Sequence, residues 1–490
     1  MSKKPIPSRL FKPIAENHLP YAGLATSLYE EHRYEAKVKG QLPEGLKGRL
    51  YRNGPGLFDR NGLRKRMLLD GDGMIQCYDF SKPGKVTFQN RFVRTHKYIK
   101  EEEKGRFIYP TWSTLSPESF LRNLGGKLPN QSGTTVLEWG GRVFSLDEAQ
   151  PVMELDQNLE TVGEVILDSD QPKRMIHAHW KIDPKTKTWF TLSIEFGPKT
   201  HFTVMGHDET LVRQVKRRFS MPRGVYIHDW FLTERYYVFI LHPAFVQPHH
   251  LLKVMAGLDT YAEIIDWIPK KGNVVVVVPR ETSAPIRHYE TDALWAWHTL
   301  NAYEDRGELV CDFIGMTLGG GLGDENSPLF QVMRGETPDI GEEPVSLLYR
   351  YRIDLKSDQL KQEKLTTDYN CEMPMIRLDR LGHKNRWGYF AESRPKEMMW
   401  SRLCRFDSET GNKEVYAFPE GEYCSEPVFA PRGEDEASGW VLSQCYRQQT
   451  QTSFLAVFEG GSIEKGPQAT VELTHHVPLS SHGYWQPASR

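Results

Sequence analysis

Short apolar runs separated by polar turns dominate the chain. Examples are "YYVFILHP" (236–243), "NVVVVVPRE" (273–281) and "SLLYRYRIDL" (346–355), all rich in β-branched and aromatic residues. Such runs, bounded by Gly, Pro, Asn and Asp, are typical of strands joined by turns. In "CRFDSETGNKEVYAF" (404–418), a Gly-Asn pair between two runs predicts a β-hairpin. Helices do not alternate with these strands, so the pattern favours an all-β protein, and a β-propeller fits the length best.

Two stretches break the strand pattern. Residues 116–126 ("SPESFLRNLGG") start with Ser and Pro and end in Gly, which predicts a short capped helix. Residues 245–271 have rough helical apolar spacing beside a cationic end. This segment is either a helix packed on the β core or an amphipathic patch that enters a membrane surface and admits an apolar substrate. The second interpretation makes an entrance of Phe120, Leu121, Phe245, Val246, Leu251, Leu252 and Met255.

Composition narrows the classes of function. Among 490 residues, 62 Lys and Arg nearly balance 64 Asp and Glu without a basic stripe, so nucleic acid is a poor candidate partner. The sequence has neither a signal-peptide core nor an apolar run of about 18 residues that could span a membrane. The six cysteines form no CxxC pair and are expected to be reduced thiols. A cytoplasmic protein is predicted, peripheral at a membrane if the entrance interpretation holds. The oligomeric state is left open.

Four histidines stand where an apolar run meets a polar or acidic residue: His179, His228, His298 and His482. Taken singly, a histidine in an apolar strand is more often structural than a ligand. They are scattered along the chain and could meet only where several strand ends converge, as at a propeller axis. Neutral imidazoles suit Zn, Cu, Fe and Ni.

A metal held only by neutral imidazoles needs negative charge behind the rings, supplied by acceptors of the other ring N–H. Three glutamates stand beside Pro or apolar residues, where a solvated carboxylate is unusual: Glu148, Glu372 and Glu426. Taken singly, each of them is better explained as a surface or salt-bridged glutamate than as an acceptor behind a metal ligand.

Eight segments, in order, resemble the carotenoid cleavage oxygenases. They include "GRLYRNGPG" (48–56), "LDGDGMIQCYDF" (69–80), "IHDWFLTE" (227–234), "WHTLNAYED" (297–305) and "VPLSSHGYW" (477–485). The resemblance covers about residues 35 to 485 and implies one propeller domain over 1–490, with an N-terminal arm over about 1–34. It further implies a seven-bladed β-propeller with a helical and loop cap over the metal site. By motif, the resemblance makes His179, His228, His298 and His482 ligands of a non-haem Fe(II), backed by Glu148, Glu372 and Glu426, with no further catalytic residue.

The sequence departs from the family pattern at two places. Trp180 stands where the family usually has Pro after its first ligand, and His177, on the same side of an extended strand, is the fallback ligand. Asp147 stands where lignostilbene-cleaving relatives typically carry a lysine that binds the substrate phenol. Asp147 could accept a hydrogen bond from a hydroxylated substrate end, or it could be a turn residue bonded to solvent or backbone.

Chemistry then favours an oxygenase. Ferrous iron can donate electron density to O2, whereas zinc has no redox chemistry. The resemblance implies oxidative cleavage of a C=C bond of a lipophilic carotenoid or apocarotenoid into two carbonyl products. The alternative is cleavage of a phenolic stilbene or phenylpropene to aromatic aldehydes. An isomerase, an inactive homologue, a zinc hydrolase and a metal-free binding scaffold are further alternatives, and metal content and dependence on O2 test the last two.

Overall fold

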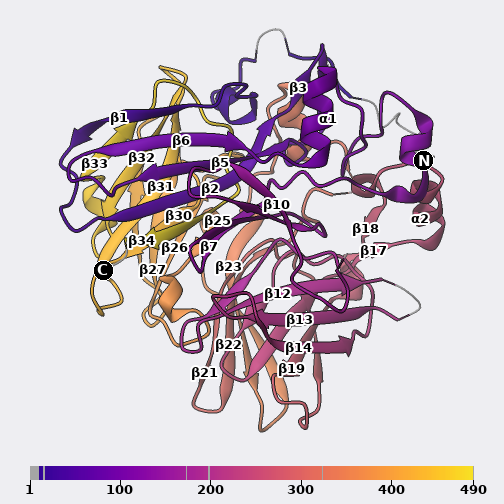
Figure 1. Ribbon diagram of the computed structural model, residues 1–490. Coiled ribbons are helices and arrows are strands. Elements are labelled where there is room, and N and C mark those ends of the chain that lie inside the picture. The colour runs from indigo at the N-terminus through magenta and orange to yellow at the C-terminus, as the bar shows by residue number, and fades with distance from the viewer. Residues whose placement is uncertain (1–9, 15–16, 173, 197–198, 323, 489–490) are drawn as a thin grey trace.

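The computed structural model describes residues 10–14, 17–172, 174–196, 199–322 and 324–488. Within these ranges the chain is all-β, with short helices between the strands and a propeller-like arrangement of sheets (Figure 1). This confirms the prediction of an all-β protein with a propeller-like arrangement.

Five antiparallel sheets each contain four strands that pair in chain order. The first two consist of β7 (Thr135–Trp139), β8 (Arg142–Leu146), β9 (Val152–Leu155) and β10 (Thr161–Val165), and of β11 (Lys181–Asp183), β12 (Thr188–Glu195), β13 (His201–His207) and β14 (Arg213–Ser220). The third contains β15 (Phe231–Leu232), β16 (Tyr236–Leu241), β19 (Asn273–Pro279) and β20 (Arg287–Thr291). The fourth and fifth are formed by β21 (Thr299–Asp305), β22 (Glu308–Met316), β23 (Ser346–Asp354) and β24 (Gln359–Lys364), and by β25 (Asn370–Met375), β26 (Trp387–Ser393), β27 (Arg402–Asp407) and β28 (Lys413–Ala417). The hairpin predicted over 404–418 is β27–β28.

A ten-stranded sheet combines strands from both ends of the chain. It contains β29 (Glu422–Tyr423), β30 (Pro427–Pro431), β31 (Gly439–Arg447), β32 (Thr452–Glu459), β33 (Ala469–Glu472), β1 (Arg33–Gly40), β6 (Val86–Phe92), β5 (Asp72–Asp79), β2 (Gly48–Leu57) and β34 (His482–Pro487). In Figure 1 the indigo and purple strands β1, β2, β5 and β6 accordingly lie beside the yellow strands β31–β33.

The described residues thus form five separate four-stranded sheets rather than the seven blades that the resemblance implies. The reason is the position of β1. Its first half, residues 33–36, pairs with β6, and its second half, residues 37–40, pairs with β33. One long strand therefore joins the sheets on its two sides into a continuous sheet.

The β19 strand shows why some apolar runs do not alternate with polar residues. Val275 and Val277 pack in the core between the third and fourth sheets, whereas Val276 and Val278 pack in the core between the second and third. Successive side chains of a strand point to opposite faces, so a strand covered on both faces is apolar throughout.

The first strands of successive sheets are neighbours around the centre of the molecule. β11 contacts β15, β15 contacts β21, β21 contacts β25 and β25 contacts β30, and β34 lies between β30 and β7. The segments that enter these strands therefore converge, as expected at a propeller axis.

Helical segments and short strands lie in the connections. They are η1 (Ala22–Ala25), β3 (Asp59–Arg60), β4 (Leu63–Arg64), α1 (His96–Lys104), η2 (Phe120–Gly126), β17 (Ala244–Val246), α2 (Pro248–Met255), η3 (Tyr261–Glu263), β18 (Ile265–Trp267), η4 (Pro269–Lys271), α3 (Pro328–Gln331), η5 (Val332–Arg334), η6 (Leu378–Arg380) and η7 (Ile463–Lys465). The helix predicted over 116–126 is the shorter 3-10 helix η2, capped by the Ser119 side chain.

Residues 245–271 do not form the single long helix that their apolar spacing predicts. α2 ends at Met255, and β17 and β18 pair with each other on either side of it. Pairing of Val246 with Ile265 closes a local hairpin around α2, and these backbone bonds displace the longer helix.

Residues 1–9 and 15–16 of the predicted N-terminal arm lie outside the described residues. From residue 17 onward the arm packs on the domain, where Leu24 and Ala25 are buried with Phe58. All six cysteines are buried and free, which confirms the prediction of unpaired thiols. No helix in the described part of the chain is both long and apolar enough to cross a membrane.

Candidate metal centre

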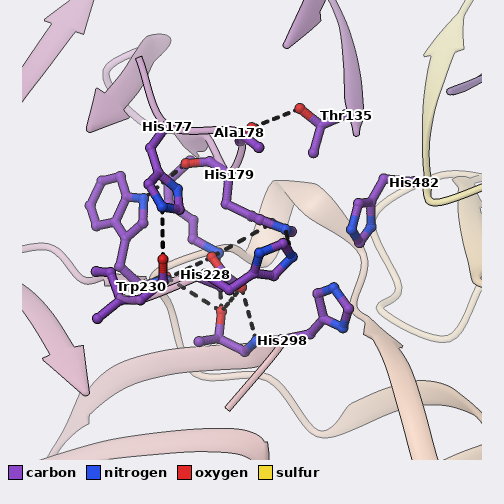
Figure 2. Close-up of polar contacts among 12 residues, drawn as sticks. Thr135, His177, Ala178, His179, His228, Trp230, His298 and His482 are labelled. Atoms are coloured by element: carbon purple, nitrogen blue, oxygen red, sulfur yellow. Dashed lines mark hydrogen bonds and ion pairs between the residues drawn. The ribbon is translucent and has the colours of Figure 1, made fainter. Parts of the chain in front are cut away.

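The four histidines singled out in the sequence meet at the starts of first strands. His179 precedes β11, His228 precedes β15, His298 immediately precedes β21, and His482 is the first residue of β34. Each offers one nitrogen to a group in which these atoms lie within 4.8 Å of one another. Figure 2 shows the four rings gathered around a common point.

Each of three rings has a glutamate on the side away from the cluster. Nδ1 of His298 donates to Glu372 Oε2 at 2.6 Å, and Nδ1 of His482 donates to Glu426 Oε1 at 2.7 Å. Nδ1 of His228 lies 2.7 Å from Glu148 Oε1. The structure therefore brings together all seven residues proposed for the site from the sequence.

Local backbone features hold the glutamates in place. The Met373 N–H donates to Glu372 Oε2 at 2.6 Å, at a β-bulge where Met373 has a left-handed φ of 54°. The Gly483 N–H donates to Glu426 Oε2, also at 2.6 Å. Both carboxylates are thus fixed by a backbone donor as well as by their histidine.

The cluster has the properties of a cation site. A neutral imidazole that donates through Nδ1 carries a lone pair on Nε2. In His298 and His482 this leaves Nε2 as the free ligand atom, and the Nε2 atoms of His179 and His228 lie 3.0 Å apart. Lone pairs that converge in a buried space repel one another unless a cation lies among them. The donor set therefore fits a metal ion that accepts neutral nitrogen ligands.

Burial keeps two of these rings neutral. It lowers the pKa of His179 and of His228 well below the usual value, and the neighbouring histidines lower it further. Neutral imidazole is the form that binds a metal.

The fallback ligand His177 lies outside the cluster. Its Nε2 is 2.8 Å from the carbonyl oxygen of Ile227 and 3.0 Å from Glu148 Oε2. Its ring is thus directed at the segment before His228 rather than at the four-histidine centre.

A cavity of about 600 Å³ extends from the cluster. His228, His298 and His482 form part of its wall, as do Glu148 and Glu372. Loops around Leu128 and over 318–322 and 324–329, the last of which includes the start of α3, also line it. Its aromatic lining consists of Trp112, Tyr226, Trp267, Trp297 and Trp400. The metal centre is therefore open on one side to a mainly apolar chamber.

The predicted entrance residues lie outside the lining of this cavity. Phe120, Leu121, Val246, Leu251, Leu252 and Met255 are exposed, but neither they nor Phe245 belong to the described lining of the cavity. Phe245 is half-buried and packs against the core between the second and third sheets. Leu69, Leu128 and Leu318 line the cavity instead.

Asp147 lines the cavity, but its carboxylate turns to its own loop. It accepts hydrogen bonds from the Ser132 N–H at 3.0 Å, the Thr134 hydroxyl at 2.7 Å and the Glu148 N–H at 2.9 Å. These contacts match the alternative of a backbone-bonded turn residue.

Sequence reasoning missed two cavity residues beside the metal centre. The Tyr226 hydroxyl lies 2.8 Å from His228 Nδ1, and the Trp297 ring packs edge-on against the His228 ring with centroids 4.7 Å apart. A signal was present, since Tyr226 stands two residues before one proposed ligand and Trp297 immediately before another.

Comparison with known proteins agrees with this fold. Residues 24–487 match the family described as retinal pigment epithelial membrane protein, and the chain belongs to this family, the carotenoid oxygenases. The family includes dioxygenases that cleave carotenoids.

Individual relatives differ in their named substrates. The chain is 28% identical over 467 residues to apocarotenoid-15,15′-oxygenase of Synechocystis, covering 91% of this chain and 92% of that protein. It is 25% identical over 480 residues to isoeugenol monooxygenase of Pseudomonas nitroreducens, covering 94% and 95%. The crystal structure of the cobalt-substituted Synechocystis oxygenase is similar with a TM-score of 0.87 and 26% identity, covering 96% of this chain and 98% of that one.

Proposed function

We propose that this protein is a non-haem Fe(II) dioxygenase that cleaves one C=C bond of a carotenoid or apocarotenoid into two carbonyl products. The observation that carries the proposal is the apolar cavity of about 600 Å³ that opens onto three of the four clustered histidines. His179, His228, His298 and His482 would hold the iron, which supplies the redox activation of O2 that zinc lacks.

The remaining residues of the site orient the histidine rings and enclose the substrate. Glu148, Glu372 and Glu426 fix the rings of His228, His298 and His482 and place negative charge behind them. The aromatic and methionine side chains of the cavity hold an apolar alkene next to the histidines and exclude water from it. This division of labour suits a reaction in which the protein chiefly selects and positions one double bond.

The size of the cavity supports a long lipophilic substrate. Pockets of about 300–1,000 Å³ enclose most of a drug-sized ligand, and this cavity falls in the middle of that range. The alternative, a phenolic stilbene or phenylpropene, is supported by the similarity to isoeugenol monooxygenase over most of the chain. Against it, Asp147 presents no cation to a phenol, and its carboxylate is engaged by its own loop.

Product analysis distinguishes the two substrates. The protein is purified without oxygen, loaded with Fe(II), and exposed to air with a β-apocarotenal or, separately, with isoeugenol or resveratrol. We expect shorter apocarotenoid aldehydes from the first substrate, and no product when O2 or iron is withheld. Hydroxybenzaldehydes from the phenols, with the apocarotenal intact, would transfer the proposal to the alternative substrate class.

We also propose that α2 and η2 form a peripheral membrane contact. The two segments contact each other. The Tyr261 hydroxyl of η3, just beyond α2, also donates to the carbonyl oxygen of Gly126 at the end of η2. Leu121 on η2 is 74% exposed and Leu252 on α2 is 68% exposed. Exposed apolar side chains on an amphipathic surface are a common means of binding the boundary between headgroups and acyl chains.

Replacing Leu251 and Leu252 together by Asp should abolish sedimentation with liposomes and leave the iron content unchanged. The physical reason is that two carboxylates would have to enter the apolar part of the bilayer. The matched control replaces Val162 and Ile166 by Asp, since Val162 on β10 is 64% exposed and Ile166, directly after β10, is 61% exposed. Equal sedimentation of both double variants and the wild type would remove this surface from consideration.

We further propose that the ten-stranded sheet counts as two blades, which gives seven blades in one domain. Seven first strands support this count, because β30 and β34 take the same central place in the ten-stranded sheet as β7, β11, β15, β21 and β25 take in theirs.

A further inference from the structure

His179 differs from the other three clustered histidines. None of Glu148, Glu372 and Glu426 contacts its ring in the described part of the chain. The carboxylate beside it belongs to Asp229, whose Oδ1 lies 3.7 Å from His179 Nδ1. This distance is too long for a hydrogen bond, so Asp229 does not repeat the role of the glutamates.

Asp229 instead accepts four other donors. Oδ2 accepts from the Thr299 N–H at 2.9 Å and from the Thr299 hydroxyl at 2.6 Å. Oδ1 accepts from Lys181 Nζ at 2.8 Å and from the Trp230 N–H at 2.7 Å. The Asp229 side chain is only 4% exposed, so its charge and its geometry are both fixed by these partners.

The positions of these partners explain why the contacts matter. Asp229 directly follows His228, Thr299 directly follows His298, and Lys181 stands two residues after His179. A single carboxylate thus ties together three histidine-bearing segments that enter three different sheets. The Trp230 indole N–H adds a further link, donating to the His179 carbonyl oxygen at 2.9 Å (Figure 2).

Lys181 balances the negative charge of Asp229. Three glutamates and the fully buried Arg52, whose Nη1 lies 3.7 Å from Glu426 Oε2, would together with a divalent ion be neutral. A bare Asp229 carboxylate would add uncompensated negative charge next to His179. Lys181 cancels that charge at 2.8 Å.

We propose that Asp229 is a positioning residue that sets the spacing of His179, His228 and His298, and that Lys181 neutralises it so that His179 stays the one ligand without a carboxylate on its ring. This inference rests on the proposed metal centre. Asp229, Lys181 and Thr299 also line a second cavity, of about 80 Å³, together with His179, so the network lies directly against the cluster.

The test is a titration of the metal-free protein with Co(II), followed by the visible absorption of the bound ion. Asp229→Asn keeps the shape but presents an amide N–H2 where Lys181 and Trp230 donate. We expect at least a ten-fold loss of Co(II) affinity and a changed spectrum, because Asp229 holds the segments that carry three of the ligands. Loss of outer residues that orient metal ligands typically costs about 10–100-fold. Lys181→Met keeps the length but removes the cation, and should bind Co(II) at least as tightly as the wild type.

The matched control is Asp312→Asn, which disrupts the buried Asp312–Arg350 ion pair between β22 and β23. It should lower the unfolding temperature while leaving Co(II) affinity and spectrum unchanged. If a single variant does not fold, Asp229→Asn combined with Lys181→Met removes both buried charges and should show the same loss of affinity as Asp229→Asn.

The outcomes separate the two levels of inference. A wild-type protein that fails to bind Co(II) contradicts the proposed metal centre itself. Wild-type affinity and spectrum in Asp229→Asn would overturn the positioning role alone, and so would a Lys181→Met protein that loses affinity as Asp229→Asn does.

Discussion

Replacing His298 by alanine is expected to abolish iron binding and, with it, turnover. His298 is 8% exposed and donates to Glu372 at 2.6 Å, so the substitution removes a metal ligand and leaves a buried carboxylate without its partner. Loss of an outer partner alone typically costs about 10–100-fold in metal affinity. Loss of the ligand should therefore exceed about 100-fold, measured as iron bound per chain after reconstitution and as product formed in air.

His288→Ala is the matched control, because His288 is an exposed residue of β20 away from the cluster. It should retain full iron content and the wild-type rate. Full iron content in the His298→Ala protein would show that the four-histidine cluster is not the iron site.

Replacing Lys97 by methionine is expected to destabilise the fold by about 3–5 kcal/mol, the usual result of leaving buried charges without their partner. Lys97 on α1 is fully buried, with Nζ 2.6 Å from Asp72 Oδ1 and 2.9 Å from Glu101 Oε2. Both carboxylates are at most 1% exposed. Guanidinium unfolding at pH 7 would measure the difference.

The pH dependence of this difference has a definite sign. Burial raises the pKa of Glu101, but Lys97, Lys65 and the backbone N–H groups of Ile108 and Tyr109 together outweigh it and lower the pKa to about 2. An unfolded glutamate titrates at about pH 4.3. The Glu101 carboxylate therefore stabilises the wild type above that pH and ceases to do so as the pH falls toward 2. The gap between the wild type and Lys97→Met should therefore narrow below about pH 4.

Lys100→Met on the same helix provides the comparison, since its partner Glu103 and Lys100 itself are 54% and 42% exposed. The unfolding midpoint should stay at the wild-type value. A Lys97→Met protein as stable as Lys100→Met at pH 7 would mean that the buried triad makes no net contribution to stability.

Much of the fold could be predicted because strands and turns are local features. The hairpin over 404–418 follows from its turn, and the unbroken valines of β19 follow from burial on both faces. The number of separate sheets could not be predicted, because β1 divides its backbone bonds between β6 and β33 and no local pattern encodes that division. α2 is shorter than the apolar spacing of 245–271 predicts, because the pairing of β17 with β18 is a tertiary contact that the sequence pattern does not encode.

The candidate site shows the same limit. Histidines at strand starts could be singled out from the sequence, and the family resemblance selected the same four that the structure brings together. Asp229 was not selected, although it stands in an apolar run beside His228 as the proposed glutamates stand beside apolar residues. Its role depends on Thr299 and Lys181 reaching it from two other sheets, and that proximity exists only in the folded chain.

The pairing of β2 with β34 bears on how the protein matures. Asn53 pairs with His482, so the fourth histidine reaches the cluster only when strands that begin at residues 48 and 482 meet. Contacts between such distant segments are among the slowest to form, because a long loop must close before they stabilise anything. Until the segment that contains His482 has been synthesised and has paired with β2, the chain can assemble no more than three of the histidines. Full-strength binding of a metal ion at the cluster should therefore wait for this pairing. In a refolding experiment, the rate of metal uptake would then report the rate at which β2 and β34 pair in the last step of folding.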